Sequence, residues 1–193
     1  MHIYYVTSNQ TKFFEAQLVW SEDRDETELL QAPLGLIEIQ GTSQEICRHK
    51  AKQAFMLQKK PVIVDDVSIY FPALRGLPGP YIRTFLEHLG EDGLFSLISK
   101  FEDRSCSALC TIGYVDHADK EPILFEGHLH GTLSSPKGNK LLHGKGWNRI
   151  VKIDGCEKTI AEMSLEEFTD YGFRKTPLLQ LKSFLRKQRN EHS

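Results

Sequence analysis

The two adjacent carboxylates Asp65 and Asp66 constrain what this chain can fold into more than any other pair of residues. They follow residues 61–64, a Pro-Val-Ile-Val run whose β-branched content predicts a buried strand. We expect the acids at the C-terminal end of that strand, where the sheet of an α/β protein opens to solvent and binds ligands. The sequence therefore predicts an α/β fold with a site at this sheet edge.

Two neighbouring carboxylates repel each other, and a bound cation relieves that repulsion. Mg²⁺ is bound by carboxylate oxygens and commonly by the phosphates of a substrate. The pair therefore suggests a magnesium site and a phosphate-bearing ligand. An isolated Asp-Asp pair also occurs in solvated loops and as a helix or turn cap, and taken alone that interpretation is the more common one.

Composition predicts a single soluble domain spanning 1–193, with 40% hydrophobic residues. Lysine and arginine total 24 against 26 acidic residues, a net charge of −2 that gives no electrostatic case for binding nucleic-acid polymers. No apolar stretch reaches membrane-spanning length, and the N-terminus lacks the basic flank of a secretory signal. We therefore expect no membrane partner and a cytoplasmic protein.

The cysteines are scattered without metal-ligand spacing, which argues against a zinc site or a disulfide framework. We expect them to be reduced and mostly buried. Cys106 and Cys110 are four residues apart in a predicted strand, which places them on one face and favours core packing over a redox couple.

A strand at 2–6, a polar turn and a helical pattern follow one another at the N-terminus. Such a junction directs backbone N–H groups and the positive end of the helix dipole at an anion, and Lys12 adds a charge there. The alternative is an ordinary N-cap at Ser8, Asn9 or Thr11 with a solvated Lys12, which is the more common arrangement of the turn alone.

The next segments add a further carboxylate and a lysine. Residues 21–34 carry a charge run that we interpret as a helix tail and loop, and 34–41 read as a strand containing Glu38. A capping-box pattern at Thr42 predicts a helix that carries Lys50. Glu38 is therefore a third candidate carboxylate.

The second half of the chain continues the alternation of strands and helices. Its expected elements are two short helices split by Gly90, an antiparallel pair of strands at 105–115 and 122–133, a glycine- and lysine-rich loop at 136–148 and an amphipathic helix at 177–185.

Six segments in one order along nearly the whole chain resemble the inosine triphosphate pyrophosphatase family. They are Thr7-Ser8-Asn9 with Lys12, Glu38 before Gln40-Gly41, Asp65-Asp66, Gly76-Leu77-Pro78-Gly79-Pro80-Tyr81-Ile82, Gly146-Trp147, and Thr159-Ile160-Ala161-Glu162-Met163. The resemblance implies an elongated mixed β-sheet flanked by helices, two lobes around a central cleft, and a homodimer. It also implies hydrolysis of ITP, dITP and XTP to monophosphate and pyrophosphate, which cleans the nucleotide pool.

The same resemblance assigns roles to individual residues. It implies Mg²⁺, or Mn²⁺, held by Glu38 and Asp66, and catalytic roles for Asp66, Asp65 and Lys12. The residues that it assigns to nucleoside triphosphate binding are Thr7, Ser8, Asn9, Lys12, Lys50, Arg83, Gly146, Trp147, Asn148 and Arg174. Arg83 keeps the charge of the family's lysine but changes its donor geometry.

The chain departs from the family where the purine base is read. The family's Phe and Asp around the tryptophan are replaced by Lys145 and Asn148, and its later Lys and His by Phe168 and Phe173. Loop 137–146 is also about three residues longer than usual, a change that loops tolerate. These losses leave the preferred base open, because a site built on hydrogen bonds discriminates far less without them.

Lys140 and Lys145 are candidates to replace the missing positive charge, and His143 is a candidate for contact with the base. Two other functions stay open. One is a catalytically weakened nucleotide-binding protein, which the losses at Phe168 and Phe173 motivate. The other is a pyrophosphatase of a different modified nucleotide.

Overall fold

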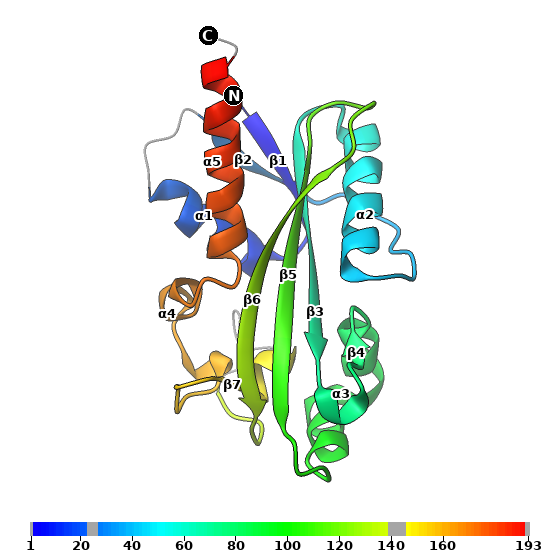
Figure 1. Cartoon of the computed structure of the whole chain (residues 1–193), viewed down its shortest axis with the longest axis vertical. Coiled ribbons are helices and arrows are strands. Elements are labelled where there is room, and N and C mark those ends of the chain that lie inside the picture. The colour runs from blue at the N-terminus through cyan, green and yellow to red at the C-terminus, as the bar shows by residue number, and fades with distance from the viewer. Residues whose placement is uncertain (1, 23–26, 139–145, 192–193) are drawn as a thin grey trace. The chain divides into compact units, whose positions relative to one another are not determined.

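The computed structural model describes residues 2–22, 27–138 and 146–191 and has a mixed α/β fold (Figure 1). In these residues seven strands form one sheet in the order β2-β1-β3-β5-β6-β7, with β4 paired to β3. The strands are β1 His2–Val6, β2 Glu28–Ala32, β3 Val62–Tyr70, β4 Pro78–Gly79, β5 Ser105–Val115, β6 Ile123–Leu133 and β7 Val151–Ile153. The α-helices are α1 Gln10–Ser21, α2 Ser43–Gln58, α3 Ile82–Ile98, α4 Leu165–Asp170 and α5 Lys175–Glu191, and the 3-10 helices are η1 Pro72–Leu74, η2 Gly146–Arg149 and η3 Ile160–Glu162.

The chain divides into two compact units. Unit 1 comprises Met1–Asp66, Cys110–Gly127 and Phe173–Ser193, and unit 2 comprises Val67–Leu109 and His128–Gly172. Strands β3, β5 and β6 contribute residues to both units. That all 193 residues act as a single domain stays a prediction.

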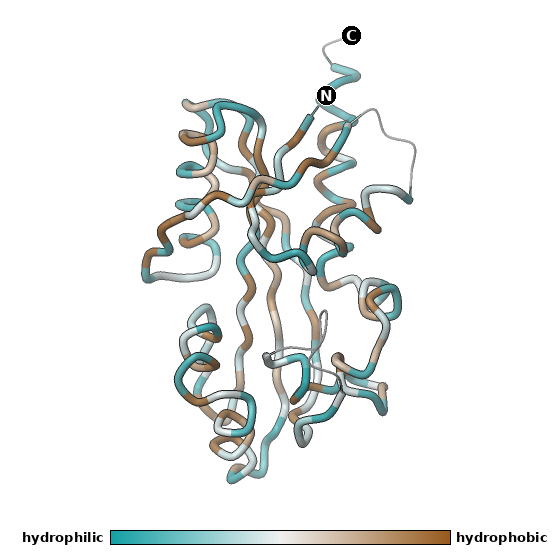
Figure 2. The backbone as a smooth tube through the Cα atoms, turned by 180° about the vertical axis from the view of Figure 1, so that it is seen from behind, coloured by the Kyte–Doolittle hydropathy of each residue, from teal (hydrophilic) through white to brown (hydrophobic). Residues whose placement is uncertain are grey.

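The helices of unit 1 cover opposite faces of its strands, because successive residues of a strand point to opposite sides. Gly113 of β5 leaves room for α2, since a Cβ there would lie 2.9 Å from Cys47 Sγ. The next residue, Tyr114, packs edge-on against Phe184 of α5, with ring centroids 6.1 Å apart. Figure 2 shows hydrophobic stretches along the strands between these helices. The predicted strand at 2–6 and C-terminal helix are both confirmed.

A buried lysine joins α5 to α1 in unit 1. Lys182 is 1% exposed, and its Nζ donates to the carbonyl oxygens of Trp20 at 3.0 Å and Val19 at 3.4 Å. The same Nζ lies 5.6 Å from the ring centroid of Trp20. Carbonyl groups at the C-terminal end of a helix carry its negative dipole charge, so the lysine caps α1.

Unit 2 contains β4, α3 and β7. β4 runs antiparallel to β3, with Ile69 opposite Gly79, and β7 runs antiparallel to β6. The helix α3 bends at Gly90, whose φ of 66° lies in the left-handed region. The prediction of two helices split by Gly90 is therefore confirmed, since α3 consists of two helical segments that meet at this non-helical residue.

The predicted loop before residue 34 and the predicted strand at 34–41 are both wrong, and residues 23–26 of the charge run lie outside the described residues. Strand β2 occupies Glu28–Ala32, in the segment interpreted as a loop, and pairs parallel with β1. Residues 34–41 form no strand, because Pro33 lacks the N–H that a ladder needs and the following segment turns toward α2. There the Ile37 N–H donates to Gln53 Oε1 at 2.6 Å.

The expectation that the cysteines are mostly buried is confirmed. All four cysteines are free thiols, and Cys47, Cys106 and Cys110 are buried, so the last two are core residues of β5. In the described part of the chain, no helix is both long and apolar enough to cross a membrane.

Candidate active site

Asp65 and Asp66 lie in the middle of β3, which corrects the expectation that they end it. The strand continues to Tyr70, and the acids are only 4% and 7% exposed. Because neighbouring residues of a strand point to opposite faces, their carboxylates do not share one cation. Asp65 contacts residues of α1 and the start of α5, whereas Asp66 contacts residues of α2.

Asp65 belongs to a buried charge network on the α1 face. Its Oδ2 lies 2.9 Å from Lys12 Nζ and 3.0 Å from Arg174 Nη2. The other arm of Arg174 binds the buried carboxylate of Glu15. Arg174 therefore joins two acids inside unit 1, where the side chains of all three are at most 4% exposed.

The pKa values in this network follow from burial and charge. Burial opposes the ionised form of Asp65, but the positive charges of Lys12 and Arg174 outweigh it and hold its pKa well below the usual range. Burial raises the pKa of Glu15, and Arg174 offsets only part of that rise. Asp65 is therefore a permanent anion that fixes the position of the Lys12 ammonium.

The N-terminus of α1 is capped by Asn9, which selects one of the three predicted caps. Its Oδ1 accepts from the backbone N–H of Thr11 at 3.0 Å and of Lys12 at 3.2 Å. Thr7 Oγ1 accepts from the Asn9 N–H at 3.1 Å, and Ser8 is exposed. Lys12 is not simply solvated, because it pairs with Asp65, so this helix end combines a positive dipole with a fixed cation.

Asp66 belongs to a second network on the α2 face. Its Oδ2 accepts from the hydroxyl of Ser43 at 2.9 Å, and that hydroxyl lies 3.2 Å from Thr111 Oγ1. Its Oδ1 lies 3.6 Å from Lys50 Nζ. Burial raises the pKa of Asp66, with partial offsets from Lys50 and Ser43, so this carboxyl is a better proton acceptor than Asp65.

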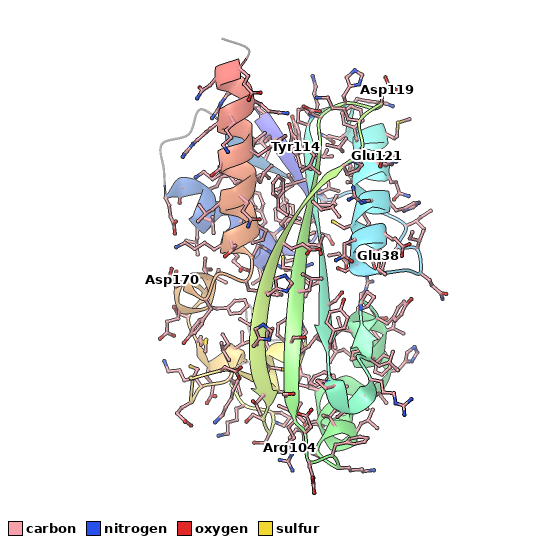
Figure 3. The ribbon with its side chains drawn as sticks, in the orientation of Figure 1. Glu38, Arg104, Tyr114, Asp119, Glu121 and Asp170 are labelled. Carbon is pink, nitrogen blue, oxygen red and sulfur yellow. The ribbon has the colours of Figure 1, made fainter. Side chains whose placement is uncertain are left out.

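Oxygen atoms converge on the ammonium of Lys50. Glu38 Oε1 and the backbone oxygen of Asp65 each lie 2.9 Å from its Nζ, in addition to Asp66. Burial alone would lower the pKa of Lys50, but these acids raise it, so the lysine is charged. Figure 3 shows Glu38 beside α2, the helix that contains Lys50.

The residues around Lys50 fit a magnesium ion. Carboxylate and carbonyl oxygens are the ligands that Mg²⁺ prefers, and one or two carboxylates commonly suffice when substrate phosphates complete the shell. Glu38 and Asp66 supply two carboxylates directed at one cation. Among the described residues, no group of three His, Cys, Asp or Glu side chains could hold a metal by itself.

The remaining predicted site residues lie in unit 2. Arg83 is in the first turn of α3, where its exposed side chain pairs with Glu87 at 3.0 Å. Gly146, Trp147 and Asn148 form η2. The candidates Lys140, His143 and Lys145 lie outside the described residues.

The two phenylalanines that replace the family's Lys and His are core residues. Phe168 is 3% exposed in unit 2, and Phe173 is 1% exposed in unit 1. Neither ring replaces the polar group that the family pattern has at its position. At both positions, the polar side chain of the family pattern is therefore replaced by a buried aromatic ring.

Sequence reasoning missed several residues of these networks. Glu15 lies three residues after Lys12, so helical spacing could have placed both on one face of α1. Ser43 and Thr111 carry no local signal, because their contacts with Asp66 and with each other join distant segments. Glu91 likewise meets η2 only through the fold.

An α/β fold with lysines set against carboxylates beside a helix N-terminus is typical of proteins that hold an anionic ligand. The chain belongs to the Ham1 family, whose model matches residues 3–184.

Relatives of known name match along almost the full length. The inosine triphosphate pyrophosphatase of Pyricularia oryzae is 37% identical over 186 residues, covering 96% of this chain and 94% of that protein. The enzyme of the same name from Yarrowia lipolytica is 38% identical over 185 residues, or 96% of each chain. A HAM1 protein structure from Coxiella burnetii has a TM-score of 0.82 at 22% identity, covering 97% of this chain and 99% of that one. This structural likeness supports the fold.

Proposed function

We propose that this chain is a nucleoside triphosphate pyrophosphatase that hydrolyses deaminated purine nucleotides such as ITP, dITP and XTP to the monophosphate and pyrophosphate. Sequence identity of 37% and 38% to two inosine triphosphate pyrophosphatases, over nearly the full length of the chain, supports the substrate class. One observation of the structure carries the chemistry: adjacent carboxylates on β3 are each set against a different lysine.

The triphosphate is held at the N-terminus of α1. Thr7, Ser8 and Asn9 precede the helix, and their backbone lies at its positive end. Lys12 adds a charge whose position Asp65 fixes at 2.9 Å. This fixed cation stabilises the negative charge of the leaving pyrophosphate, which is the main requirement of phosphoryl-group hydrolysis.

Asp66 is the carboxylate that accepts the proton of the attacking water. Its contacts support that role, because Asp65 is already bound by Lys12 and Arg174, whereas Asp66 accepts one hydroxyl hydrogen bond and lies 3.6 Å from Lys50 Nζ. Glu38 and Asp66 would hold Mg²⁺ or Mn²⁺. The ion, when bound, neutralises phosphate charge. Lys50 balances the two acids before substrate arrives.

Turnover of purified protein tests the proposal. We expect pyrophosphate release from ITP, dITP and XTP in the presence of Mg²⁺, and little release from ordinary nucleotides or after chelation. Absence of turnover on every nucleotide would refute the function.

Asp66→Asn tests the assigned acid. We expect activity to fall by at least about a hundredfold, since a general base contributes roughly that much, with an unchanged circular dichroism spectrum. Asp119→Asn removes an exposed acid of the turn after β5 and is the matched control, with activity unchanged. Near-normal turnover by Asp66→Asn would show that another acid is responsible.

A catalytically weakened nucleotide-binding protein is the second candidate. The burial of Phe168 and Phe173, where the family pattern has Lys and His, favours it. Calorimetry that gives tight ITP binding without product would support this function. A pyrophosphatase of a different modified nucleotide would instead turn over another base with the same metal dependence.

The resemblance supports an assembly, and the composition supports a location. We propose a homodimer in the cytoplasm. Light scattering coupled to size-exclusion chromatography measures the first, and a monomer at micromolar concentration would contradict it.

A further inference from the structure

Glu91 of α3 binds both ends of η2 within unit 2. Its Oε1 accepts from the Gly146 N–H at 2.8 Å, and its Oε2 accepts from the guanidinium of Arg149. Trp147 and Asn148 lie between those two contacts. One carboxylate therefore clamps the turn that presents the two residues.

The Glu91–Arg149 pair is shielded from solvent. Both side chains are 16% exposed, and Arg149 Nε is buried without a hydrogen-bond partner among the described residues. Charge-assisted hydrogen bonds of this kind are stronger than neutral ones and are screened little by salt. Glu91 is thus the carboxylate that neutralises Arg149.

The backbone of η2 needs this support. Gly146 has φ of 66°, a left-handed conformation, and a Cβ there would lie 3.1 Å from Leu86 Cδ1 of α3. Gly90 breaks α3 directly before Glu91, which places the carboxylate at the start of the second helical segment. Glu91 therefore follows one glycine with positive φ, Gly90, and binds the N–H of another, Gly146.

We propose that Glu91 and Arg149 are positioning residues that fix Trp147 and Asn148 for nucleotide binding. This inference rests on the proposed function, because the resemblance assigns Trp147 and Asn148 to binding of the nucleoside triphosphate. Neither residue contacts the reacting atoms in this scheme. They act on the pose of the turn and hence on substrate affinity.

Two substitutions at Glu91 separate its contacts. Glu91→Gln keeps an oxygen for the Gly146 N–H but loses the charge that Arg149 needs, and Glu91→Ala loses both. We expect KM for ITP to rise about threefold in the first and about tenfold in the second, with kcat within about twofold, because only binding is affected. Glu157→Gln removes the carboxylate of an exposed ion pair in the same unit and is the control, with KM unchanged.

A double-mutant cycle tests the pair itself. Arg149→Gln should raise KM about as much as Glu91→Gln, and the double variant should be no worse than either, since both remove one interaction. Additive losses would show that the two residues act separately and would overturn the proposal.

The pose of Trp147 has a direct readout that does not require turnover. The chain has two tryptophans, so 5-fluorotryptophan labelling gives two ¹⁹F resonances, and Trp147→Phe assigns one of them. In Glu91→Gln we expect the Trp147 resonance to shift or broaden while that of Trp20 stays fixed. An unchanged Trp147 resonance together with an unchanged KM would refute the positioning role. If the wild-type protein hydrolyses no nucleotide, the proposed function fails, and the ¹⁹F comparison still decides whether Glu91 fixes the turn.

Discussion

Neighbouring acids on β3 have opposite electrostatic roles. Asp65 is held ionised by Lys12 and Arg174, whereas burial raises the pKa of Asp66. The difference arises from strand geometry, which directs the two carboxylates into separate charge networks. One acid therefore organises positive charge, and the other is available to take a proton.

Asp65→Asn should destabilise the protein in a pH-dependent way. Removing one partner from a buried ion network costs about 3–5 kcal/mol at pH 7. The folded pKa of Asp65 is depressed, so its stabilisation is complete above the unfolded value of about 3.9 and is lost as pH falls toward the folded value. The difference from wild type in urea unfolding should therefore be constant from pH 7 to about 5 and shrink below about 4.

Asp66→Asn is the matched comparison on the same strand. Because burial raises the pKa of Asp66, ionisation of this group opposes folding, and its neutral isostere should retain wild-type stability. A larger loss in Asp66→Asn than in Asp65→Asn would reverse the assignment of the two acids.

At the scale of elements, the sequence predicts features that depend on neighbouring residues. It does not predict features that depend on pairing between distant segments. The capping box at Thr42 with Glu45 sits where the sequence predicts it, since both partners are within one helical turn. The end of β3 depends instead on pairing with β4, where Tyr70 lies opposite Pro78. No pattern within 61–66 contains that information, so the sequence predicts the correct strand for the two acids but not their position within it.

The junction of β6 with α5 should tolerate no side chain at Gly127. A Cβ there would lie 2.2 Å from the carbonyl oxygen of Phe173 and 2.7 Å from Pro177 Cδ. Gly127→Ala should lower the free energy of unfolding by about 1–3 kcal/mol through overpacking, and should reduce activity because Arg174 follows Phe173. Chemical denaturation and ITP turnover measure both effects.

Gly35→Ala is the control for this substitution. No atom lies within 4 Å of a Cβ built at Gly35, so alanine should fit without strain. Equal destabilisation by the two variants would show that the short distances at Gly127 are relieved by a small backbone shift.

For the molecule as a whole, the exposure of the cysteines measures how well the core of each unit excludes solvent. Cys47 and Cys110 in unit 1 are 0% exposed, and Cys106 in unit 2 is 5% exposed. Burial raises the pKa of Cys106 and Cys110 to about 12, which suppresses the reactive thiolate. Cys156 is only half-buried.

A thiol reagent at pH 8 should therefore modify one cysteine in the native protein and four after denaturation. Mass spectrometry of the native product should find the label on Cys156. Rapid native labelling of Cys106 or Cys110 would mean that β5 opens readily.

The family assignment at this scale was reachable from sequence, because six short segments in one order span nearly the chain. The contacts that the residues of those segments make with distant residues could not be predicted from the sequence. Arg174 reaches Glu15 across 159 residues and Asp65 across 109. Contacts at such separations are set by topology, which no window of sequence records.

Side chains along β3 alternate between its two faces, so a shift by one residue would move every side chain to the opposite face. Substitutions on one face leave the register intact, so side chains of either network can change without reversing the faces of the strand. Loss or gain of a single residue between Val62 and Asp65 would exchange the faces and turn each acid toward the other's lysine. Homologous strands should therefore diverge in composition while their length stays constant.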